Sequence, residues 1–172
     1  VTFQTLNTSN KPDATFKAAG EGYVGDPSFV GIRSNNKPAI LGSGSTGRLY
    51  KVNDVNKDVD FVTGSQIAVP TFENGALMGD RYVLLDRVRD DLSGAEIVLV
   101  DTSVTPAVSR AVLQKPAGSA PAAIGFDASR DLVYIMNPTT RELRSFSESD
   151  ITAAFTSQTL LDWSTDGTPV GA

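Results

Sequence analysis

The stretch APAAIGFDASRDLVYIMNPTTRELRSF, residues Ala120–Phe146, contains three short β-type runs in succession. Ala122–Phe126 is small and apolar, Leu132–Met136 is continuously apolar, and Glu142–Phe146 alternates polar with apolar residues. The residues between the runs are rich in Asp, Ser, Asn and Pro, which favour turns. Three runs joined in this way predict an antiparallel meander.

The same arrangement recurs along the chain. A short run with apolar first and fourth residues, closed by Asn, Asp or Ser, begins at Phe3, Leu49, Ile97 and Leu143, at intervals of 46 to 48 residues. An apolar residue followed by glycine recurs at similar intervals, with glycines at positions 31, 79, 125 and 171. A period in the forties, with short strands and no long helical pattern, is typical of β-propeller blades.

The sequence therefore predicts an all-β fold: one β-propeller segment over residues 1–172, with four antiparallel strands per blade. The predicted parts are a partial blade at 1–19, blades at about 27–70, 74–115 and 120–163, and the start of a further blade at 168–172. A larger propeller, completed by further blades of the same protein or by a second chain, explains the partial blades at both ends. The alternatives are a closed four-bladed disc, a sandwich and a solenoid-like stack.

Two details of the last predicted blade depend on local pattern. Thr159–Leu161 is expected to be its fourth strand. Ser149–Phe155 is expected to form one helical turn in the preceding loop, capped by Ser149 or Asp150.

One blade junction resembles a family of bacterial and archaeal repeats. Ala95–Asn137 contains Val100-Asp101-Thr102, Gly118-Ser119-Ala120-Pro121 and Val133-Tyr134-Ile135, in that order. These residues resemble propeller repeats of the YVTN, NHL and lactonase-like kind. The resemblance implies a β-propeller and, as in many relatives, secretion or surface display. It implies no particular activity, because this fold supports hydrolases, lyases, redox enzymes and binding scaffolds.

Composition excludes several classes of function. The chain has no Cys and no His, which rules out disulfides, zinc–thiolate sites, histidine metal ligands and a Ser–His–Asp triad. Its net charge of −5 argues against nucleic acid and anionic membrane surfaces as partners. No apolar run approaches the roughly 20 residues of a membrane-spanning helix. The acidic, Cys-free composition favours an extracellular, periplasmic or cell-surface location.

The motif NDVNKDVD is the candidate metal site. Asp54, Asn56, Asp58 and Asp60 alternate along it and resemble a calcium-binding loop. An EF-hand loop requires Gly at its sixth position and Glu at its twelfth, and here Val and Ser occupy those positions. A polar hairpin with Asx turns is the simpler interpretation, and a partial calcium site is the alternative. No other cofactor is expected.

A charged insert is the candidate partner contact. Its residues are Asp86, Arg87, Arg89, Asp90 and Asp91, with Glu96 nearby. A solvated loop whose charges pair with one another is the simpler interpretation. Trp163 is the only tryptophan, and we expect it to be partly buried at the end of a strand or against the neighbouring blade.

The leading functional interpretation is a non-enzymatic binding or scaffold segment that contacts protein or glycan through loops and exposed sheet edges. The first alternative is a lactonase- or glycosidase-like enzyme with an acidic, calcium-assisted central site. In relatives of that kind the ligands come from several blades, and Glu73, Asn74 and Asp127 are the candidates here. The second alternative is a structural subunit of an extracellular filament or lattice.

Overall fold

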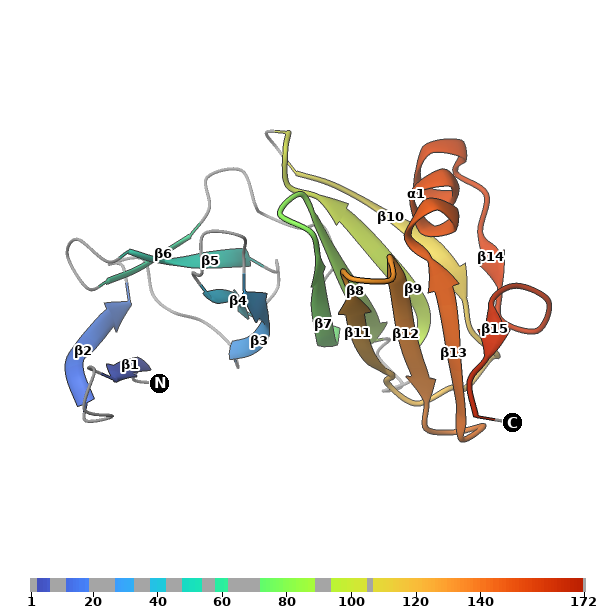
Figure 1. The fold of residues 1–172 in the computed structure, drawn as a ribbon, viewed down its shortest axis with the longest axis horizontal. Helices are drawn as coiled ribbons and strands as arrows, with labels where there is room; N and C mark the ends of the chain where they lie inside the picture. The colour runs from blue at the N-terminus through green and yellow to red at the C-terminus, as the bar shows by residue number, and fades with distance from the viewer. Residues whose placement is uncertain are drawn as a thin grey trace.

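The structure, a computed structural model, confirms the all-β class: it contains fifteen strands and one helix within the residues that it describes. Before residue 72 it describes the backbone of six strands, over residues 3–6, 12–18, 27–32, 38–42, 48–53 and 58–61. Beyond that point it describes residues 72–88, 94–104 and 107–171 with nearly all of their side chains. The first sheet lies at one end of the long axis of the molecule, and the second and third sheets lie against each other at the other end (Figure 1).

The first sheet contains six strands in the order β1-β2-β6-β5-β4-β3. Its strands are β1 (Phe3–Leu6), β2 (Pro12–Ala18), β3 (Pro27–Ile32), β4 (Pro38–Gly42), β5 (Arg48–Asn53) and β6 (Asp58–Phe61). β3 to β6 form an antiparallel meander, β2 lies parallel to β6, and β1 lies beyond β2 at the edge of the sheet.

The second sheet contains five strands in the order β14-β10-β9-β8-β7. Its strands are β7 (Phe72–Met78), β8 (Tyr82–Val88), β9 (Gly94–Asp101), β10 (Val108–Gln114) and β14 (Leu161–Asp162). β7 to β10 repeat the four-stranded antiparallel meander. β9 carries the run Ile97–Val100, and all four of these side chains are buried. A continuously apolar, β-branched run of this kind is typical of a strand covered on both faces.

The third sheet is formed largely by the stretch Ala120–Phe146. Its strands are β11 (Ala123–Asp127), β12 (Leu132–Asn137), β13 (Glu142–Ser147) and β15 (Thr168–Pro169), in that order. Asn137 closes the β12–β13 turn, because its side-chain oxygen accepts from the backbone N–H groups of Thr139 (3.0 Å) and Thr140 (3.4 Å). The predicted meander is therefore confirmed.

The fourth strand of this sheet differs from the prediction. We expected Thr159–Leu161 there, but β14 instead lies parallel to β10 in the second sheet. The place next to β13 is taken by β15, which we had assigned to the start of a further blade. The physical reason is the helix between β13 and β14, which carries the chain back over the second sheet before it returns.

That helix, α1 (Glu148–Ser157), is longer than the single turn predicted. Its N-cap is Ser147, the last residue of β13, whose hydroxyl oxygen accepts from the Asp150 N–H at 3.0 Å. Ile151, Ala154 and Phe155 form its buried face. The strand therefore leads directly into the helix through one capping side chain.

Of the two repeated sequence patterns, the short apolar runs occupy equivalent positions in the fold and the glycines do not. All four marker runs lie in strands, namely β1, β5, β9 and β13. The glycines do not occupy equivalent positions: Gly31 pairs with Ala39 inside β3, and Gly125 pairs with Tyr134 inside β11. Gly79 follows β7 in the turn to β8, where its φ of +63° favours glycine. The agreement in glycine spacing therefore does not reflect a shared structural position.

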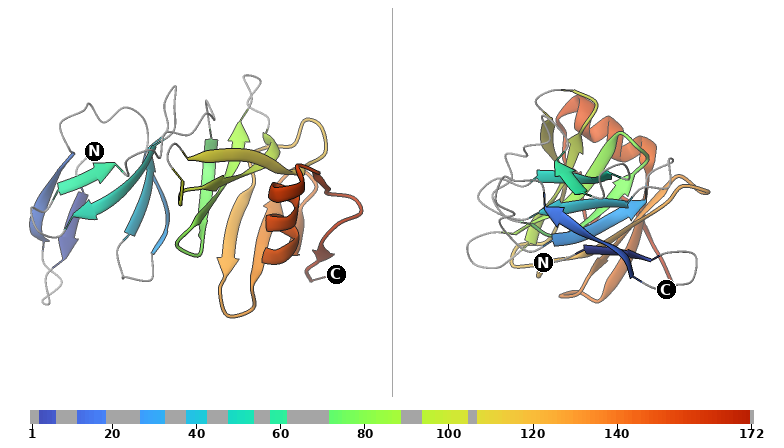
Figure 2. Two further views of the ribbon diagram at one scale, coloured as in Figure 1. Left: turned by 90° about the horizontal axis from the view of Figure 1, so that it is seen from above. Right: turned by 90° about the vertical axis from the view of Figure 1, so that its left-hand side faces the viewer.

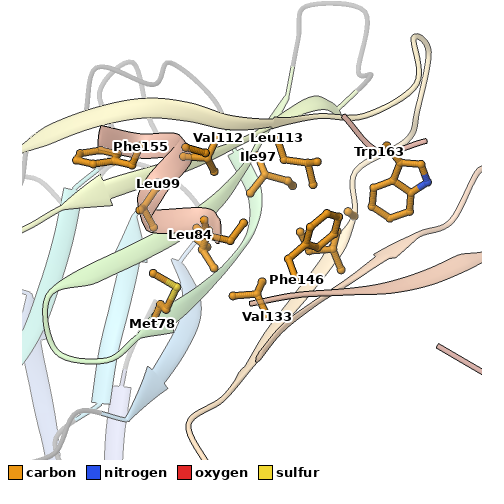
Figure 3. Packing of buried hydrophobic residues seen from close by; sticks show 14 residues of the cluster. Met78, Leu84, Ile97, Leu99, Val112, Leu113, Val133, Phe146, Phe155 and Trp163 are labelled. Atoms are coloured by element: carbon orange, nitrogen blue, oxygen red, sulfur yellow. The ribbon is translucent and has the colours of Figure 1, made fainter. Parts of the chain in front are cut away.

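The second sheet is buried on both faces. A large apolar cluster fills the space between it, the third sheet and α1. Figure 3 shows this cluster and labels ten of its residues: Met78, Leu84, Ile97, Leu99, Val112, Leu113, Val133, Phe146, Phe155 and Trp163. A second cluster lies on the opposite face and contains Phe72, Leu77, Val83, Leu85, Val98 and Val100. β7 contacts β11 of the third sheet and β3 of the first. The second sheet is therefore the middle layer of the three, as Figure 2 also shows from above.

Candidate functional site

A buried ion pair lies at the start of the segment that connects the second sheet to the third. Lys115 directly follows β10, and its ammonium group lies 2.8 Å from a carboxylate oxygen of Asp86 in β8. Both side chains are 0% exposed. Lys115 follows Gln114 and precedes Pro116, and nothing in this local pattern shows that it meets a residue 29 positions earlier. The ion pair therefore leaves no recognisable signal in the sequence.

The pair holds the connection between the two sheets. The second carboxylate oxygen of Asp86 accepts a hydrogen bond from the Ala122 N–H, and Lys115 also donates to the Ala120 carbonyl at 3.4 Å. From β7, the Asn74 side chain donates to the Ala122 carbonyl at 2.9 Å. Side chains from β7, from β8 and from the end of β10 therefore hold the few residues that precede β11 in place.

Buried hydroxyl and amide groups complete this cluster. Ser119 donates to the Pro116 carbonyl at 2.6 Å and accepts from the Asn137 side chain at 3.2 Å. Ser119 and Asn137 are both 0% exposed. Buried polar groups are tolerated when each finds a partner, and Ser119 finds its partners within the connecting segment and at the end of β12.

The role of this cluster is structural: it holds the third sheet on the second. Burial lowers the pKa of Lys115, and the neighbouring Asp86 carboxylate opposes that shift. A lysine nucleophile with a lowered pKa must also reach a substrate. Both side chains are sealed from solvent, so the pair orients the third sheet on the second and offers no surface to a ligand.

A second ion pair, between Arg81 and Asp101, stabilises the end of the second sheet at which β7 turns into β8. Arg81, in the β7–β8 turn, donates to Asp101 from Nε (3.2 Å to each carboxylate oxygen) and from a terminal nitrogen (2.7 Å). Asp101 also accepts from the N–H (2.9 Å) and hydroxyl (2.6 Å) of Ser103. The Arg81 bond, followed by these donors, lowers the pKa of Asp101 to about 2.

This Asp-x-Ser turn recurs at strand ends. Asp127 Oδ1 accepts from the N–H and hydroxyl of Ser129 after β11, and Asp162 Oδ1 does the same for Ser164 after β14. In each case the short carboxylate satisfies a backbone donor as the chain leaves the strand. These carboxylates are therefore engaged in turns.

The predicted partner contact divides into two parts. Asp86 lies inside β8 and is the buried anion described above, so it is not the exposed loop residue that we expected. Arg87 is about half exposed and pairs with Glu96 of β9 at 3.1 Å, which agrees with self-paired charges. Arg89, Asp90 and Asp91 lie outside the described residues, and their role stays a prediction.

The predicted metal ligands are only partly described. Asp54 and Asn56 lie outside the described residues, while the backbones of Asp58 and Asp60 belong to β6. Within the part of the chain that the structure describes, no three His, Cys, Asp or Glu side chains gather as metal ligands would. A calcium site at this motif stays a prediction.

The candidates for a central metal site have other contacts. Asn74 binds the Ala122 carbonyl, and Asp127 is held by Ser129, with Arg130 at 3.7 Å. The side chain of Glu73 is not among those described.

Trp163 is more deeply buried than the partial burial that we expect from the sequence. It is 3% exposed, its ring centroid lies 6.1 Å from that of Phe146, and its indole N–H donates to Glu142 at 2.9 Å. The guanidinium of Arg144 lies over the ring, 5.6 Å from its centroid. Trp163 therefore anchors the end of β14 to β13 and is a packing residue.

An open surface hollow of about 350 Å³ lies beside the start of α1. It is lined by Arg130, Asp131, Leu132, Ser147, Glu148, Ser149 and Thr152. Acidic side chains outnumber the single arginine at a helix end that favours anions, so this lining suits no simple anion.

Comparison with known proteins does not assign this chain to a family. Among the described residues, the helix α1 is not long and apolar enough to cross a membrane. The sequence matches no protein-family model, and it matches no curated protein.

Proposed function

We propose that this chain is a non-enzymatic binding and scaffold segment built from β-propeller blades. The observation that carries the proposal is the placement of the first strands. β7, the first strand of the second meander, contacts both β3 and β11, the first strands of its neighbours. In a propeller the innermost strands of successive blades gather around a common axis. The three repeated meanders and the doubly covered second sheet support the same arrangement.

The scaffold role is supported by what the described charged groups do. The buried pair Asp86–Lys115 and the Arg81–Asp101 pair both hold elements of the fold together. Function then resides in loops and sheet edges, where a rigid scaffold presents variable residues to a partner. We propose Arg89, Asp90 and Asp91 as a contact for protein or glycan, in an extracellular or cell-surface setting.

Spin-label distances test the blade arrangement. The chain has no Cys, so pairs of cysteines can be introduced without background labelling. One pair, Asp80→Cys with Ala128→Cys, reports the turns after the first strands, and a second, Val108→Cys with Thr168→Cys, reports the fourth strands. A propeller fans outward from its axis, so the second distance is expected to exceed the first. Equal distances would instead indicate a parallel sandwich.

A binding and turnover assay tests the scaffold role. The chain is presented to glycan and secreted-protein arrays beside a variant with Arg89→Ser, Asp90→Ser and Asp91→Ser. The proposal expects binding that this variant loses, and no hydrolysis of lactones or glycosides with or without calcium. Calcium-dependent turnover would favour the enzymatic alternative.

A further inference from the structure

Asn74 and Gly75 form the only Asn-Gly pair in the sequence, and both lie in β7. The pairing of β7 with β8 is irregular at this point. Phe72 pairs with Arg87, whereas Gly75 pairs with Leu85. Two residues of β7 therefore lie opposite a single residue of β8, which is the arrangement of a β-bulge. Asn74, the second of these two residues, is exposed, so the Asn-Gly pair lies at an accessible break in the ladder.

The side chain of Asn74 helps to hold the segment that precedes β11. Its amide nitrogen donates to the Ala122 carbonyl at 2.9 Å, and the Ala122 N–H in turn donates to Asp86. Asp86 is the residue of β8 that lies opposite the bulge, and both Asp86 and Ala122 are 0% exposed. Figure 1 shows β7 beside β11, the strand that Ala122 precedes. Asn74 therefore joins an exposed position in the second sheet to the buried connection that orients the third.

An asparagine that is followed by glycine is prone to spontaneous deamidation. The backbone nitrogen of Gly75 attacks the side-chain carbonyl carbon of Asn74, a cyclic succinimide closes, and the amide nitrogen leaves as ammonia. Water then opens the ring and yields aspartate, or isoaspartate, in which the main chain runs through the former side chain. Glycine favours ring closure because it has no Cβ and the widest choice of backbone dihedral angles. The only reagent is water, which reaches Asn74 because this residue is exposed.

We propose that Asn74 is a deamidation site and that its conversion weakens the attachment of the third sheet to the second. The product replaces an N–H donor with a carboxylate oxygen, so two acceptors face each other at the buried Ala122 carbonyl. Isoaspartate also lengthens the main chain of β7 at the bulge. The modification is slow and irreversible, and it goes beyond the proposed scaffold role without depending on it.

Ageing of the full chain in mildly alkaline heavy-oxygen water tests the site. Each conversion adds one solvent oxygen, so peptide mass spectrometry identifies the converted residue, which is expected to be Asn74. Asn137 is an internal control in the same sample, because it is 0% exposed and the Pro138 that follows has no N–H to close the ring. Asn74→Gln is the matched variant, since its longer side chain disfavours the succinimide, and it should stay unlabelled. An aged wild-type chain with Asn74 intact would overturn the proposal.

Hydrogen exchange at the Ala122 amide tests the consequence. The aged chain and Asn74→Asp are each expected to exchange this amide at least about tenfold faster than the fresh wild type. Gln158→Glu makes the same amide-to-carboxylate change at the exposed C-cap of α1, and it should leave exchange at Ala122 unchanged. Equal exchange before and after ageing would refute the weakening. If Asn74→Asp does not fold, the aged and fresh wild-type samples still decide the outcome.

Discussion

Breaking the buried ion pair from either side should strongly destabilise the fold. In Lys115→Met the Asp86 carboxylate stays 0% exposed and keeps the Ala122 N–H but loses its counter-ion. Removing one partner of a buried pair costs about 3–5 kcal/mol of unfolding free energy. In Asp86→Leu the amine can lose its proton, which limits the electrostatic cost at pH 7 to about 5 kcal/mol.

The double variant should be much less damaging than the sum of the two single variants. With both charges gone, the main remaining defect is the unpaired Ala122 N–H, at about 1–3 kcal/mol. The expected coupling between Lys115 and Asp86 is therefore several kcal/mol. If a single variant fails to fold, the double variant should still fold.

Urea unfolding followed by tryptophan fluorescence measures these changes, since Trp163 is the only tryptophan and is 3% exposed. Arg87→Ala, which breaks the exposed pair with Glu96, is the control and should cost less than about 1 kcal/mol. Single-variant losses below about 1 kcal/mol, or additive losses, would refute the view that this pair fastens the two sheets.

Three further predictions concern turns. The folded pKa of Asp101 is about 2, below its ordinary 3.8, so its stabilising contribution is complete above pH 4 and disappears as pH falls to about 2; acid titration should show a loss of about 1–2 kcal/mol that Asp101→Asn lacks. Gly167→Ala should cost about 1–3 kcal/mol in urea unfolding, because φ is +73° and the new Cβ would lie 2.5 Å from the Phe146 ring; an unchanged midpoint would contradict this. Arg141→Gly should raise the thermal midpoint, with a gain of about 0.5–1 kcal/mol, because φ is +59° there; a lower midpoint would count against the strain.

The strand content could be predicted from the sequence because its causes are local. Alternation and β-branched runs mark β9 and β12, and Asp and Asn side chains close the turns that follow. The repeat also placed all four marker runs in strands. The glycine marker failed because one glycine satisfies a turn at position 79 and another lies inside a strand at position 125, and spacing alone does not separate the two roles.

The tertiary structure decided the features that depend on residues far apart in the chain. The sequence by itself determined an all-β chain of repeated meanders, since side-chain period and turn residues act over a few positions. It could not show that β15 replaces Thr159–Leu161 beside β13, because α1 redirects the chain. Nor could it show that Asp86 is buried: a carboxylate beside four other charged residues suggests a surface loop until Lys115 is brought to within 2.8 Å. Burial of a charge depends on its partner, and only folding places that partner.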